Sequence, residues 1–145
     1  MARHFVDTSA LVKLYRNEPQ TAAVQSCIGS NDSLVLCGIT FLEFQSAFFG
    51  LVRQGLLSQG TAQQRISLLR QDLRNFTLAP LTQMLVTSAE ALIQQFGVSE
   101  GLRPADSLQL AAALDMHGQQ PLDSIISTDV ILRRCSTASG LIVKP

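Results

Sequence analysis

The sequence predicts an α/β fold with a central, mainly parallel sheet flanked by helices. Short apolar runs of strand length alternate along the chain with longer segments of helical period, the pattern typical of parallel α/β proteins. The chain has 145 residues, of which 46% are hydrophobic and 15% charged, so it can bury one core and is too apolar to be disordered. No internal repeat, linker or low-complexity segment divides it, and we expect a single domain over residues 1–145.

The first elements are two strands with a short helix between them. Residues 4–6 (HFV) have the composition of a buried strand. The apolar residues from Leu11 to Tyr15 have helical spacing, and Pro19 prevents this helix from continuing far. After a turn rich in Gly, Asn and Asp, residues 33–39 (SLVLCGI) predict the second strand.

Two consecutive helices are predicted next. The first begins at Thr40, carries phenylalanines three and four residues apart, and ends at Gly55, which is suited to a left-handed cap. The second covers residues 59–75, with apolar residues on one face and arginines and glutamines on the other. We expect these helices to form a hairpin.

The second half of the chain continues the alternation. Residues 77–81 are a weak strand candidate because of Pro80, and the helix that follows ends at Gly97. Residues 103–106 (RPAD) begin another helix, since proline is favoured in a first turn, and its alanines predict close packing against a sheet. A strand over residues 123–128, a short helix over 129–135 and a last strand over 140–145 complete the order.

Four carboxylates occupy the joints between these elements. Asp7 follows the first strand, Glu43 lies one turn into the helix after the second, and Asp129 directly follows the strand ending at residue 128. Asp106 lies in the first turn of a further helix. Ligands of open parallel sheets collect outside the carboxyl ends of the strands, so we expect these acids to lie together.

Each carboxylate also has a purely structural interpretation. Asp7 and Asp129 could cap helices, Asp106 could face the positive end of its helix dipole, and Thr40 with Glu43 matches a capping box. Capping does not require such apolar surroundings, however, and clustered carboxylates repel one another unless a cation is present.

An acidic metal pocket is therefore the chemistry that the four carboxylates favour. Hard cations such as Mg²⁺ and Mn²⁺ prefer oxygen ligands. One or two such ions can acidify a coordinated water and neutralise a phosphoryl transition state, which amounts to phosphodiester hydrolysis without a side-chain nucleophile. The three cysteines form no CxxC and are interpreted as small hydrophobic residues, and the two histidines flank no nucleophile motif.

Five basic residues lie near the acidic motifs: Lys13, Arg16, Arg103, Arg133 and Arg134. A phosphate-bearing substrate needs some such residues to offset an acidic pocket, but each could equally be solvated surface. None is assigned as a substrate contact. The eleven basic and eleven acidic residues balance, so net charge neither favours nor excludes a nucleic-acid partner.

The motifs FVDTSALVKLYRNEP, ITFLEFQSAF, LRPADSLQLAAAL and IISTDVILRRCSTASGLIVKP resemble, in this order, those of PIN domains. The resemblance covers nearly the whole chain and is strongest to the VapC-type toxins of type II toxin–antitoxin pairs. It implies a three-layer α/β/α fold and a metal-dependent endoribonuclease that hydrolyses RNA at an Mg²⁺ or Mn²⁺ site.

The family's acidic quartet carries over to Asp7, Glu43, Asp106 and Asp129 as catalytic residues. By resemblance, Asp7 and Asp106 are direct metal ligands, while Glu43 and Asp129 either bind metal or position water. Ser9 and Ser127 match hydroxyl positions of the family. They either support the carboxylates by hydrogen bonds or cap helices.

The resemblance also implies partners, and the sequence itself predicts a location. We expect an RNA substrate, a cognate VapB-like antitoxin and a homodimer, to which the apolar helices would contribute surface. The start of the chain lacks the apolar core of a signal peptide and no apolar run approaches bilayer-spanning length, so we expect a cytoplasmic protein without membrane association.

Two other functions remain open. One is a catalytically inactive PIN-fold module that binds RNA or protein. The other is a phosphatase or phosphotransferase of the haloacid-dehalogenase type, which begins with Asp-x-Asp after its first strand. This chain has Asp7-Thr8-Ser9 there, so it lacks the second acid.

Overall fold

The computed structural model describes residues 1–145 and contains five strands and seven α-helices. The strands are β1 (Arg3–Val6), β2 (Ser33–Cys37), β3 (Thr77–Ala79), β4 (Ser124–Ile126) and β5 (Val143–Lys144). The helices are α1 (Thr8–Tyr15), α2 (Thr21–Ser26), α3 (Thr40–Arg53), α4 (Gln59–Asp72), α5 (Gln83–Phe96), α6 (Pro104–Gln119) and α7 (Val130–Ala138), with one 3₁₀ turn, Leu73–Asn75.

The five strands form one sheet in the order β3-β2-β1-β4-β5, and every pairing is parallel. The expected mainly parallel sheet is therefore confirmed. Because β1 is central, its carboxyl end lies between those of β2 and β4. This arrangement brings residues just after all three strands to one edge of the sheet.

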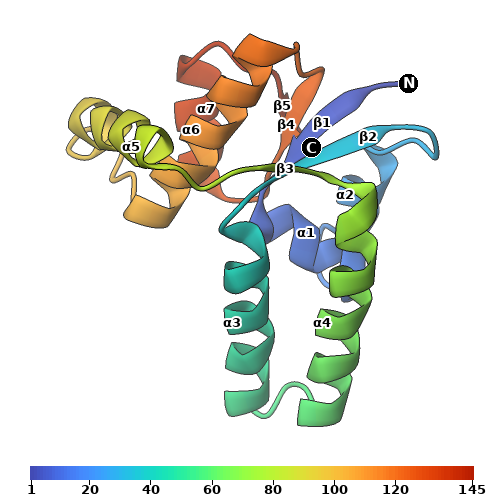
Figure 1. Ribbon diagram of the computed structural model, residues 1–145. Coiled ribbons are helices and arrows are strands. Elements are labelled where there is room, and N and C mark those ends of the chain that lie inside the picture. The colour runs from blue at the N-terminus through green and yellow to red at the C-terminus, as the bar shows by residue number, and fades with distance from the viewer.

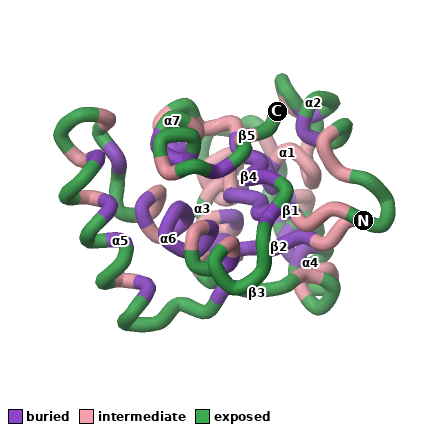
Figure 2. The backbone as a smooth tube through the Cα atoms, turned by 90° about the horizontal axis from the view of Figure 1, so that it is seen from above, coloured by how far each residue is buried: buried purple, intermediate pink, exposed green.

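Helices cover both faces of the sheet, which gives the expected three-layer α/β/α architecture (Figure 1). Successive strand side chains point to opposite faces, so Phe5 packs in a core with α5, α6 and α7, whereas Val6 packs in a core with α1, α3 and α4. Both residues are fully buried. Figure 2 shows β1, β2 and β4 in this buried interior, while much of α5 remains exposed.

The predicted hairpin of α3 and α4 is confirmed, and the two helices run side by side away from the sheet (Figure 1). Phe44 and Phe48 of α3 are fully buried and their rings stack with centroids 4.5 Å apart. Gly55 has a φ of 72°, the left-handed conformation expected of it just after the helix.

The alanines of α6 pack as predicted. Ala111, Ala112 and Ala113 are at most 3% exposed and lie in the same core as Phe5. Small side chains allow α6 to approach both the sheet and α5 closely. Two of the three cysteines, Cys37 and Cys135, lie in this core as small apolar groups, and all three are free.

Several element boundaries differ from those predicted. The helix α2 was not expected, because its six residues bury only Thr21 and Val24 and so give no periodic signal. The second strand ends at Cys37 instead of residue 39. At Gly38 the chain passes so near β3 that a Cβ would lie 3.0 Å from the Ala79 carbonyl oxygen, and the backbone turns toward α3.

No helix of the chain combines the length and the apolar character needed to cross a membrane.

Candidate active site

A cavity of about 170 Å³ lies at the carboxyl ends of the central strands, and all of its lining residues are polar. Four segments supply them: the β1–α1 joint, the start of α3, the start of α6 and the β4–α7 joint. The lining residues are Asp7, Thr8, Ser9, Glu43, Arg103, Asp106, Gln109 and Asp129. The structure thus brings the four carboxylates singled out in the sequence to one cavity.

Asp7 is the most buried of the four carboxylates, with 4% of its surface exposed. Its Oδ1 accepts hydrogen bonds from the Ser9 hydroxyl at 2.9 Å and from the Ala10 backbone N–H at 3.2 Å. Burial raises the pKa of Asp7 to about 7, against the lowering effect of these hydrogen bonds. A nearby cation would favour the ionised form of such a carboxylate.

The two predicted supporting serines tie the β1 and β4 ends together. Ser9 donates to Asp7, and its Oγ accepts hydrogen bonds from the backbone N–H and hydroxyl of Thr128 at 3.0 and 3.1 Å. Ser127 is fully buried and its Oγ accepts from the Asp129 backbone N–H at 3.1 Å. The side chains that cap α1 and α7 are Asp7 and Asp129, so neither serine has the capping role.

Asp129 combines both interpretations that the sequence left open. Its Oδ1 caps α7 by accepting a hydrogen bond from the Leu132 N–H at 2.8 Å. Its Oδ2 accepts from the Arg103 guanidinium at 3.0 Å on the cavity side. Capping and a place in the acidic cavity are therefore compatible, as they are for Asp7.

The capping-box interpretation of Thr40 and Glu43 is wrong. The N-cap of α3 is Ile39, whose backbone is already helical (φ −85°, ψ −15°), so Thr40 lies inside the helix and is fully buried. Glu43 instead accepts hydrogen bonds on Oε1 from the Thr8 hydroxyl at 2.8 Å and from the Gln109 side-chain amide at 2.7 Å. Contacts with two other elements fix this carboxylate.

Gln109 and Thr8 line the site but were not identified from the sequence. Gln109 is 2% exposed, and its Nε2 lies within hydrogen-bonding distance of Thr8, Thr40 and Glu43. Its Oε1 is buried without a partner. The available signal was a lone amide within the apolar and small run LQLAAAL, one turn after Asp106.

Arg103 pairs with two of the carboxylates, Asp106 and Asp129. Its Nε donates to Asp106 Oδ2 at 2.8 Å and its Nη2 donates to Asp129 Oδ2 at 3.0 Å. No three His, Cys, Asp or Glu side chains of the chain converge closely enough to form a metal-ion cluster in this arrangement. The donors are nonetheless all carboxylate oxygens, the type that Mg²⁺ and Mn²⁺ prefer, and a cationic group already lies against two of them.

The other basic residues near the motifs lie outside the cavity. Lys13 and Arg16 pair with Glu18 at 3.2 and 2.6 Å, and Arg133 donates to the Ser127 carbonyl oxygen at 2.8 Å. Arg134 Nη1 lies 4.0 Å from Glu100. Among the five candidates, only Arg103 has a place in the site.

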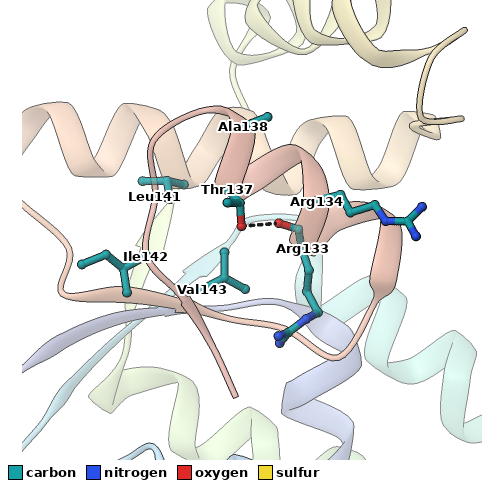
Figure 3. A pocket seen from close by; sticks show the side chains of 7 residues that line it. All are labelled: Arg133, Arg134, Thr137, Ala138, Leu141, Ile142 and Val143. Atoms are coloured by element: carbon teal, nitrogen blue, oxygen red, sulfur yellow. Dashed lines mark hydrogen bonds between the residues drawn. The ribbon is translucent and has the colours of Figure 1, made fainter.

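A larger groove of about 720 Å³ lies between α7 and β5 and lacks comparable chemistry (Figure 3). It contains no carboxylate, and the side chains of Arg133 and Arg134 point in different directions. The hydroxyl of Thr137 donates to the backbone carbonyl of Arg133. The groove therefore offers no group for acid, base or metal chemistry.

The acidic cavity does not depend on the other seven acidic residues. Those that make side-chain interactions make them elsewhere. For example, Asp32 accepts hydrogen bonds from the Ala2 and Gly29 N–H groups, and Asp72 accepts one from the Tyr15 hydroxyl. None of the seven lines the cavity, as the sequence predicted.

Comparisons with solved structures find the same fold in bacterial toxins and toxin–antitoxin complexes. Mycobacterium tuberculosis VapC20, described as a sarcin-ricin loop cleaving toxin, has a TM-score of 0.67 at 16% identity, with 98% of this chain and 99% of that chain covered. VapBC-1 of nontypeable Haemophilus influenzae gives 0.62 at 18%, covering 98% and 96%. VapBC2 of Rickettsia felis, bound to a promoter DNA fragment, gives 0.65 at 12%, covering 98% and 97%.

Sequence comparisons identify the family. No curated protein matches the chain. The family model for the PIN domain matches residues 4–136, which include all four carboxylates of the cavity and both serines. Sequence motifs, sheet topology and family match agree: this chain belongs to the PIN-domain family.

Proposed function

We propose that this protein is an Mg²⁺- or Mn²⁺-dependent endoribonuclease that acts as the toxin of a type II toxin–antitoxin pair. The observation that carries the proposal is the convergence of four carboxylates from four separate segments on one polar cavity. Membership of the PIN-domain family and the fold shared with VapC20 support the same chemistry.

Each carboxylate has a proposed role. Asp7 and Asp106 hold the cation, and Glu43 and Asp129 either complete its coordination or orient the attacking water. When bound, the cation supplies positive charge to the phosphoryl transition state and acidifies the attacking water. The Ser9 hydroxyl keeps Asp7 in position, and Gln109 and Thr8 hold Glu43 where it can accept a proton.

A side-chain nucleophile is not part of the proposal. The hydroxyls of Thr8 and Ser9 both donate to carboxylates of the cavity. Neither has a histidine or lysine base beside it in the cavity lining. Direct attack by water therefore fits the residues better than a covalent intermediate.

The proposed antitoxin partner follows from the solved structures that share this fold. The H. influenzae and R. felis structures are VapBC proteins, and we propose that this chain likewise binds a small VapB-like antitoxin. We also propose a homodimer, which the resemblance to VapC-type toxins implies; large apolar side chains such as Leu42, Met84 and Ile142 are more than 60% exposed. Light scattering that shows a monomer across a wide concentration range would rule out the homodimer.

A chelator-sensitive cleavage assay tests the nuclease. Purified protein is incubated with mixed RNAs and Mn²⁺ or Mg²⁺, with EDTA and with Asp7→Asn as controls. Internal cleavage that EDTA and Asp7→Asn both abolish is the expected result. Cleavage that survives in Asp7→Asn would disprove the site, and RNA binding without cleavage would favour the catalytically inactive binding module instead.

A further inference from the structure

The Arg103 side chain is an unusual feature of a cavity proposed to hold a cation. A single guanidinium spans Asp106 at 2.8 Å and Asp129 at 3.0 Å. Asp106 begins α6 and Asp129 begins α7, so the pair of contacts joins two helix starts. The chain itself thus supplies one positive charge against these two acids.

Arg103 is also free to leave this position. Its side chain is 61% exposed, whereas those of Asp106 and Asp129 are 14% and 25% exposed, so the guanidinium covers the carboxylates from the solvent side. Arg103 is the N-cap of α6 by its backbone alone and makes no side-chain capping bond. The side chain can therefore reorient without loss of helix structure.

A divalent cation in this cavity and the Arg103 guanidinium would be drawn to the same carboxylates. The guanidinium already occupies Oδ2 of Asp106 and Oδ2 of Asp129, and two positive groups a few ångströms apart repel each other. Asp7 and Glu43 are held by hydroxyl, amide and backbone donors, which carry no net charge and need not leave. Arg103 is the single cationic competitor in the cavity.

We propose that Arg103 is a built-in counter-ion that competes with the divalent cation for Asp106 and Asp129. It holds the two acids in place in the metal-free protein and swings into solvent when the cation binds. This inference rests on the proposed metal site, and it adds that the protein's own arginine sets the affinity of that site.

Direct titration with Mn²⁺ tests the proposal without reference to cleavage. Binding to full-length wild type, Arg103→Gln and Arg134→Gln is measured by calorimetry and by the electron paramagnetic resonance of free Mn²⁺. Arg134 is the matched control, because it is 68% exposed, carries the same charge and lies outside the cavity. Exposed ion pairs are weak, so Arg103→Gln is expected to bind Mn²⁺ roughly three- to tenfold more tightly than the control.

The outcomes distinguish the counter-ion role of Arg103 from the proposed metal site itself. Tighter binding by Arg103→Gln alone supports the counter-ion. Equal or weaker binding by Arg103→Gln than by Arg134→Gln overturns it, while the metal site of the proposed function stands. If no form binds Mn²⁺, the metal site and the counter-ion fall together. Circular dichroism of each variant confirms that the comparison is between folded proteins.

Discussion

The Gln109 amide on α6 donates a 2.7 Å hydrogen bond to Glu43 on α3, across the interior of the site. The two helices belong to opposite layers of the fold, and Gln109 shares a core-facing helix with Leu110 and Ala111. A buried amide that reaches a carboxylate through the edge of the sheet makes the position of Glu43 depend on both layers. The local sequence around Gln109 does not reveal this contact, and neither does the local sequence around Glu43.

Gln109→Leu is expected to reduce cleavage by misplacing Glu43. The substitution removes a hydrogen bond to a charged group, and the loss is expected to lower the cleavage rate about tenfold, which corresponds to about 1.4 kcal/mol. The measurement is single-turnover RNA cleavage at saturating Mn²⁺. Glu43→Gln is the comparison, and combining the two changes should cost little more than Glu43→Gln alone. Fully additive losses would show that Gln109 does not act through Glu43.

The stability of the metal-free protein is expected to fall as pH rises toward 7. Asp7 has a pKa of about 7 in the folded chain, above its ordinary value of 3.8, so the folded state binds the extra proton between these values. The contribution of this proton to the free energy of unfolding is fully present below the pKa of Asp7 in the unfolded chain. It is lost as pH rises through the pKa of Asp7 in the folded chain, with a slope of at most about 1.4 kcal/mol per pH unit.

Asp7→Asn provides the control for this pH dependence. Asparagine can still accept from the Ala10 N–H but cannot ionise, so urea unfolding in EDTA should show a flatter pH profile and higher stability than wild type at pH 8. Parallel profiles for the two proteins between pH 5 and 8 would contradict a raised pKa at this residue.

Ser9→Ala is expected to weaken both the site and the fold. It removes the donor to Asp7 and the acceptor for Thr128, and the loss of buried hydrogen bonds is expected to cost about 1 to 3 kcal/mol of unfolding free energy. Without this donor the pKa of Asp7 should rise further, so the pH profile of cleavage should move to higher pH. Ser26→Ala, at an exposed position, should change neither quantity.

Two glycine substitutions test the passage from β2 to α3. A Cβ at Gly38 would lie 3.0 Å from a backbone oxygen, whereas a Cβ at Gly60 in α4 meets nothing within 4 Å. Gly38→Ala is expected to destabilise the protein by about 1 to 3 kcal/mol through overpacking. Gly60→Ala should leave stability unchanged or raise it by up to about 1 kcal/mol. Thermal unfolding of both variants makes the comparison, and equal stabilities would contradict the close approach at Gly38.

The sequence was sufficient for the succession of the strands along the chain and for the acids of the cavity, because both depend on local pattern. A buried parallel strand such as β1 is a continuous apolar run, and an acid directly after it is conspicuous. Helix α2 gave no such pattern, since a six-residue helix with two buried side chains has no detectable period.

The hydrogen-bond partners of the site residues could not be predicted from the sequence, for a different reason. Whether Glu43 caps its own helix or bonds to Gln109 depends on how α3 and α6 are oriented about the sheet. The pairing of Arg103 with Asp129 likewise joins segments that meet only in the folded chain. Side-chain contacts of this kind follow from tertiary geometry and have no sequence period.

Asp7 and Asp129 each cap a helix and also line the acidic cavity. Their retention in a descendant of this protein would therefore not by itself indicate that nuclease function is retained. Each begins a helix with one oxygen, so selection for folding alone would retain both after a loss of nuclease function. Glu43 and Asp106 accept no backbone hydrogen bond and are free to drift once cleavage no longer matters. A lineage that has abandoned catalysis would therefore reveal it first at these two positions, while the two helix-starting aspartates stayed unchanged.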